Sequence, residues 1–82
     1  MNGTFKKIID TDSGNKEFDF QVSFGTDGII YIIDTTDEDN KQIQFQMKKD
    51  ENGRWKILPR RLPDWVWNSE LELNDAIEEN AV

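Results

Sequence analysis

The stretch 17–24 reads Glu17-Phe18-Asp19-Phe20-Gln21-Val22-Ser23-Phe24, in which polar and apolar residues alternate without interruption. Successive side chains of a β-strand point to opposite faces of its sheet, so this alternation predicts a strand with one apolar and one polar face. We expect the three phenylalanines and Val22 to lie on the face that covers the core.

The residues after this strand predict how it pairs with the next one. A turn over 25–28 is favoured by its two glycines, because glycine adopts the positive φ angles of tight hairpins without strain. Such a turn pairs Phe24 with Ile29 on the core face and leaves Ile30 and Ile32 on the polar face. The five residues from Ile29 onward are all apolar, which is typical of a central strand that is contacted on both faces.

Three other segments have the composition of strands, and groups of Gly, Asn and Asp separate the segments at intervals of about 12 residues. They are 4–11, 41–48 and 54–58. In the last of them, Trp55 and Ile57 alternate with Lys56. This regular spacing predicts a five-stranded antiparallel β-meander over about 4–58, either as a curved sheet or as an open barrel.

Two prolines mark the end of this sheet. Pro59 and Pro63 have no amide hydrogen to donate to a strand pair, so we expect 59–63 to be a connection. The sequence beyond it, 64–80, has helical character.

The helical region has two candidate starting points, Asp64 and Ser69. Ser69 followed by Glu72 fits a capping box, in which each side chain binds a free amide of the first turn. A new helix start at Asn74 is the alternative, and it would divide the region into two short helices.

An apolar stripe on this helix consists of Leu73, Ala76 and Ile77, at the i, i+3, i+4 spacing of one helix face. Because an open sheet needs a cover for its apolar face, we expect the helix to pack there. The 82 residues 1–82 therefore predict a single domain of the α+β class, and their number leaves no room for a second one.

Composition argues against catalysis. The chain contains neither cysteine nor histidine. Disulfides, thiolate chemistry and Cys-rich zinc sites are therefore excluded, and so are the commonest general base and the commonest metal ligand. We expect a protein that is not an enzyme, with no catalytic residue, no cofactor and no metal site.

The net charge of −7 also restricts the partners. Nucleic acids and anionic membrane surfaces attract basic proteins, so we expect neither as a partner. The first residues contain no apolar run of the kind found in secretory signals, and the longest apolar run, 29–33, is far too short to span a bilayer. We therefore expect a cytoplasmic protein.

Two surfaces are candidates for binding. The first is formed by Ile30 and Ile32, which would be apolar side chains among the glutamines of the outer sheet face. Such a patch fits a protein partner or the interface of a homodimer, unless the sheet curls far enough to bury it. Scattered surface isoleucines also occur without any role.

The second surface lies near the end of the chain and contains Arg60, Arg61, Trp65 and Trp67. Arginine and tryptophan are the residue types most enriched at binding hot spots, and arginine pairs with carboxylates and phosphates. The tryptophans would line a groove for a small molecule or a peptide. The alternative is that one or two of the tryptophans are core residues and that the arginines balance the charge of nearby acidic residues.

An acidic stretch from Asp34 to Asn40 resembles a cation site only in part. Asp37 and Asp39 have the spacing of the first two ligands of an EF-hand, but lysines stand where two later ligands are required. We expect a solvated hairpin loop there. The sequence as a whole favours a small acidic interaction or regulatory domain, with a small-molecule or peptide binder as the alternative.

Overall fold

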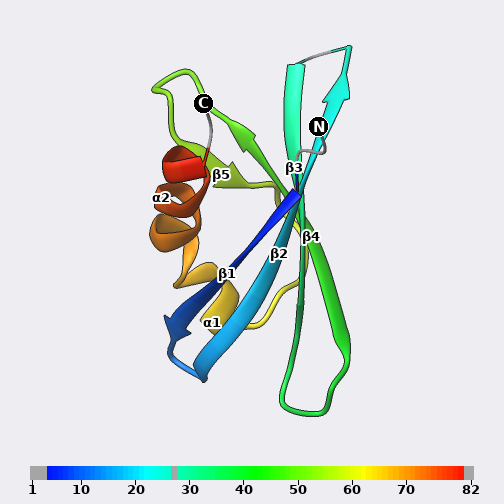
Figure 1. Ribbon diagram of the computed structural model, residues 1–82, viewed down its shortest axis with the longest axis vertical. Coiled ribbons are helices and arrows are strands. Elements are labelled where there is room, and N and C mark those ends of the chain that lie inside the picture. Colours follow the sequence, from blue (N-terminus) through cyan, green and yellow to red (C-terminus); the bar gives the residue numbers. More distant parts are fainter. Residues whose placement is uncertain (1–3, 27, 81–82) are drawn as a thin grey trace.

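The computed structural model describes residues 4–26 and 28–80, and it contains one sheet of five antiparallel strands followed by two helices (Figure 1). The elements are β1 (Thr4–Thr11), β2 (Gly14–Gly25), β3 (Gly28–Thr36), β4 (Gln42–Lys49), β5 (Trp55–Ile57), α1 (Asp64–Trp67) and α2 (Glu70–Asn80). The strands lie side by side in the order of the sequence, as in a meander. The predicted α+β class and the five-stranded meander are confirmed.

The pairing of β2 with β3 agrees with the predicted turn. Phe24 lies opposite Ile29, and Gly25 lies opposite Gly28, whose φ of 114° only glycine adopts readily. The next pair on the same face is Val22 with Tyr31. The alternation and the glycine turn were therefore together sufficient to predict the register, because a slip of one residue would turn every apolar side chain to the other face.

The sheet curls into a half-barrel, and its two edge strands do not pair with each other (Figure 1). Helix α2 contacts β5 and β1, the strands on either side of the opening. The helix residues Leu73, Ala76 and Ile77 belong to the same buried cluster as the apolar side chains of the strands. One core therefore unites the helix with both edges of the sheet.

The helical region divides at Ser69, so the helices begin at or directly after the two starting points that the sequence indicated, and not at the alternative, Asn74. The two helices are separated at Asn68 and Ser69, whereas Asn74 lies inside α2. The Ser69 hydroxyl donates a hydrogen bond of 2.7 Å to the carbonyl oxygen of Trp65, in the preceding helix. The prediction of a helix start at Asn74 is wrong because the Asn74 side chain has a partner in the sheet, described below.

The two loops that flank β4 share one design. In the first, the carboxylate of Asp37 accepts hydrogen bonds of 2.9 Å from the amides of Asp39 and Lys41. In the second, Asp50 accepts from the amides of Asn52 and Arg54 at the same distance. Each carboxylate therefore holds its own turn, as is common for Asp in loops.

This arrangement accounts for the acidic stretch after β3. Among the described residues, no group of three or more Asp, Glu, Cys or His side chains is placed to hold a metal ion.

Neither described helix is long and apolar enough to cross a membrane.

Candidate functional site

The end of the β2–β3 hairpin exposes large apolar side chains. Phe24 is 76% exposed and Ile29 is 44% exposed, although both lie on the face of the sheet that carries the core. In Figure 1 this hairpin end projects at the top of the molecule, apart from α2. The hairpin thus extends the apolar face farther than the helix covers it.

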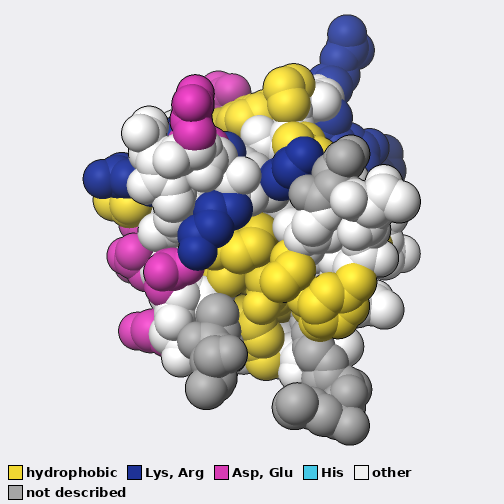
Figure 2. Space-filling model, turned by 90° about the horizontal axis from the view of Figure 1, so that it is seen from above, with side chains coloured by type: hydrophobic (Ala, Val, Ile, Leu, Met, Phe, Trp, Pro, Cys, Tyr) yellow, Lys and Arg dark blue, Asp and Glu magenta, His cyan; other side chains and the backbone are white. Residues whose placement is uncertain are grey.

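These exposed side chains lie above an aromatic row that crosses the inside of the half-barrel. Phe5 stacks on Phe20 with ring centroids 4.4 Å apart, and it meets Tyr31 edge to face with ring centroids 6.2 Å apart. Tyr31 in turn meets Trp55 edge to face at 5.0 Å. Figure 2 looks onto this end of the molecule and shows hydrophobic side chains side by side, with Lys and Arg side chains next to them.

The outer face of the same hairpin carries Ile30 and Ile32, as the register argument predicted. Both are half-buried. Ile32 lies between Gln21 and Gln46 on the neighbouring strands. The hairpin therefore carries apolar side chains on both faces.

The members of the second predicted surface make separate contacts with the sheet and the core. Arg60 and Arg61 are exposed, and the guanidinium of Arg60 donates a hydrogen bond to the backbone carbonyl of Gln44 in β4. Trp65 is half-buried and meets Phe18 edge to face at 6.3 Å, with the ammonium of Lys16 5.4 Å from its ring centre.

Trp67 is also half-buried and packs against the core cluster. Arg60 and the two tryptophans thus have structural contacts of their own, and among the described residues no hydrogen bond or cation–π contact joins the arginines to Trp65 or Trp67.

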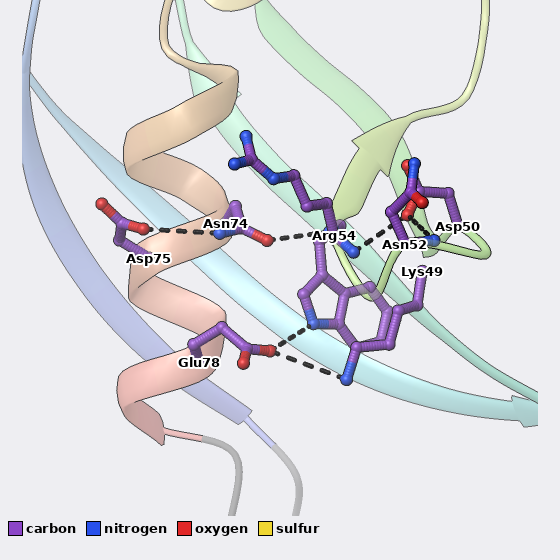
Figure 3. A network of polar contacts seen from close by, with 8 residues as sticks. Lys49, Asp50, Asn52, Arg54, Asn74, Asp75 and Glu78 are labelled. Carbon is purple, nitrogen blue, oxygen red and sulfur yellow. Dashed lines mark hydrogen bonds and ion pairs between the residues drawn. The ribbon is translucent and has the colours of Figure 1, made fainter.

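The third tryptophan lies on β5 inside a network of polar contacts made by α2 (Figure 3). The Trp55 ring nitrogen donates to the Glu78 carboxylate at 3.0 Å, and the Trp55 backbone amide donates to the Asn74 side-chain oxygen at 2.8 Å. Lys49 reaches the same Glu78 carboxylate at 3.8 Å. A hollow of about 150 Å³ beside Trp55 is smaller than the ~300 Å³ expected of a small-molecule site.

Two titratable groups among the described residues have pKa values that their surroundings shift. Burial, together with the nearby negative charge of Glu78, raises the pKa of the Tyr31 phenol, which therefore stays protonated at neutral pH. Backbone hydrogen bonds, that of Arg54 foremost, lower the pKa of the Asp50 carboxyl and keep it ionised. Both shifts follow from structural contacts.

Sequence reasoning missed the exposure of Phe24 and Ile29. It placed them correctly on the core face, but it could not show that the core ends below them. The available signal was the length of the hairpin, because β2 has 12 residues and the helix α2 has 11. A helix rises about 1.5 Å per residue and a strand about 3.3 Å, so the helix spans only about half the length of the strand.

Comparison with known proteins found no family model that matches this chain, and no significantly similar curated protein or solved structure.

Proposed function

We propose that this chain is a non-catalytic protein-interaction domain whose docking element is the end of the β2–β3 hairpin. The observation that supports the proposal is the exposure of Phe24 and Ile29, which lie opposite each other and form a patch of the kind that marks docking surfaces. Ile30 and Ile32 extend the apolar surface to the outer face of the hairpin.

The chemistry of this element favours one kind of partner. An apolar hairpin end fits a hydrophobic groove on another protein, where a central aromatic side chain contributes most of the binding energy. Lys48 lies opposite Ile30, and Lys and Arg side chains lie next to the hydrophobic ones at this end, so acidic residues around such a groove would complement the charge of the hairpin end (Figure 2). The absence of cysteine fits a reducing compartment, so a cytoplasmic location is part of the proposal.

The test is affinity capture from a lysate of the source cells with matched variants of the tagged chain. We expect one stoichiometric protein to be retained by the wild type and lost by Phe24→Glu and Ile32→Glu. Leu71→Glu is the control, because Leu71 is an exposed leucine on α2 and lies outside the hairpin. Melting curves of all variants establish that they are folded.

Other results would contradict the proposal. Retention of the same proteins by all variants would exclude the hairpin, and so would the absence of any stoichiometric protein. A partner lost only in Arg61→Ala would move the site to the arginines. Light scattering of the wild type and Phe24→Glu distinguishes a second copy of the chain from a different protein.

A further inference from the structure

The two edges of the sheet differ in how their backbone groups are satisfied. On β5, the outward amide of Trp55 donates to Asn74 at 2.8 Å, and that of Ile57 donates to Glu70 at 2.9 Å. Side chains of α2 thus take the place of a neighbouring strand. On β1, no hydrogen bond among the described residues uses a backbone group outside the pairing with β2.

The free edge of β1 is long and regular. Its eight residues pair with β2 in unbroken register, from Thr4 opposite Gln21 to Thr11 opposite Gly14. It contains neither proline nor a bulge, two of the devices by which proteins block a sheet edge, although it carries the charged residues Lys6 and Lys7. A row of free amides and carbonyls of this kind can accept another strand.

A groove of about 430 Å³ separates this edge from α2. Its walls are formed by Lys7, Ile8, Ile9, Asp10, Glu72, Asp75, Ala76 and Glu79. The four helix residues follow the i, i+3, i+4, i+7 spacing of a single helix face, and the small side chain in their middle, Ala76, leaves room beside the strand.

The groove is strongly acidic, with four carboxylates and one ammonium group. The ammonium group of Lys7 in β1 lies 3.3 Å from the Glu79 carboxylate. This ion pair shows that the helix face can bind a basic side chain. Glu72 and Asp75 lie about 5 Å apart along the helix axis. Alternate side chains of a strand are about 7 Å apart, so two of them can reach both carboxylates.

We propose that this groove binds an extended, basic segment of a partner protein, which adds to β1 as a sixth strand. Lysine or arginine side chains at alternate positions face Glu72 and Asp75 on the helix. The positions between them lie on the outer face of the sheet, next to Ile8, which is 63% exposed. This surface is separate from the β2–β3 hairpin end and does not depend on the function proposed for it.

The test uses a fluorescein-labelled peptide as long as β1, in which lysine alternates with valine, and measures its binding by fluorescence anisotropy at low salt. Two derivatives carry N-methyl groups on alternate amides, one on the lysines and one on the valines. In an added strand, the amides of every second residue point toward β1, and the amides of the residues between them point away from it. We therefore expect one derivative to lose about tenfold or more in affinity, while the other binds nearly as well as the parent.

Variants of the full chain test the contribution of the acidic residues on α2. We expect the double variant Glu72→Gln/Asp75→Asn to bind the parent peptide about five- to tenfold more weakly, as for two exposed ion pairs. The control, Asp39→Asn/Glu51→Gln, makes the same change in charge on two exposed loop residues and should leave the affinity unchanged. Melting temperatures establish that both double variants are folded.

Three outcomes would overturn the proposal. The first is that the peptide does not bind, the second is that the two N-methylated derivatives bind equally, and the third is that the two double variants weaken binding to the same extent. The second and third results would both mean that the peptide is attracted only by the overall negative charge of the chain.

Discussion

At the scale of single residues, two aspartates hold the backbone of the loops in which they lie. Asp37 and Asp50 stand at the start of loops that repeat the pattern Asp, Glu, Asx, then Asn or Gly, then a basic residue. The fourth residue has a positive φ in both, 62° at Asn40 and 81° at Gly53. The loops thus combine a carboxylate that binds two amides with a residue that tolerates the left-handed region.

This use of Asp50 predicts a pH dependence of stability. Its hydrogen bonds lower the pKa of the folded state below that of the unfolded chain, about 4. The carboxylate therefore stabilises the fold above the unfolded pKa, and the contribution is lost as the pH falls through the folded pKa. We expect Asp50→Asn to lower the melting temperature at pH 7 and to approach the wild type near pH 3.

The neighbouring exposed residue provides the control for this measurement. Glu51→Gln removes the same charge at the next position, where no hydrogen bond of the side chain is recorded among the described residues. Its difference from the wild type should stay small over the same range. A constant difference for Asp50→Asn at all pH values would contradict the assignment of its stabilising effect to the ionised form.

At the scale of elements, α2 uses three of its faces in three ways. Glu70, Asn74 and Glu78 hold the edge of β5, each through a hydrogen bond to Trp55 or Ile57. The stripe Leu73, Ala76 and Ile77 lies in the core. The remaining acidic face borders the groove along β1. On one side of the opening, side chains of α2 bind the backbone amides that a neighbouring strand would bind. On the other side, α2 forms one wall of a groove.

The contact between α2 and β5 predicts the effect of Asn74→Ala. The substitution leaves the partly buried amide of Trp55 without its acceptor, which costs about 1–2 kcal/mol even though alanine favours helices. Urea denaturation should show this loss in the free energy of unfolding. Asn74→Asp keeps an oxygen acceptor and should lose less. Equal stability of Asn74→Ala and the wild type would mean that the hydrogen bond does not hold the helix to the strand.

At the scale of the whole molecule, stability depends on the closure of the half-barrel by its helices. Val66 of α1 and Leu73 and Ile77 of α2 are fully buried, although the sheet supplies most of the other core residues. For 82 residues the total free energy of unfolding is about 4–12 kcal/mol. A single cavity in the core can therefore remove a large part of it.

Two leucines on α2 test this dependence. Leu73 is completely buried, whereas Leu71 is 58% exposed. We expect Leu73→Ala to lower the free energy of unfolding by about 2–5 kcal/mol and Leu71→Ala to change it by about 0.5 kcal/mol or less. Chemical denaturation of the two variants provides the comparison. Similar losses in both would contradict the position of α2 against the sheet.

The sequence by itself determined the strands, their order and the pairing of β2 with β3. These features depend on local patterns, since a period of two and a glycine turn at 25–28 admit one register with all phenylalanines on one face. The same patterns placed Ile30 and Ile32 on the outer face and put Trp55 and Ile57 on one common face, but the tertiary structure decided that this face is the inner one.

Only the tertiary structure decided where α2 lies against the sheet, and the features that follow from this position. The use of Asn74 by Trp55, the exposure of Phe24 and the groove along β1 all depend on how segments far apart in the sequence are placed. The physical reason is that periodicity specifies which face of an element is apolar, but burial depends on how much of that face another element can cover.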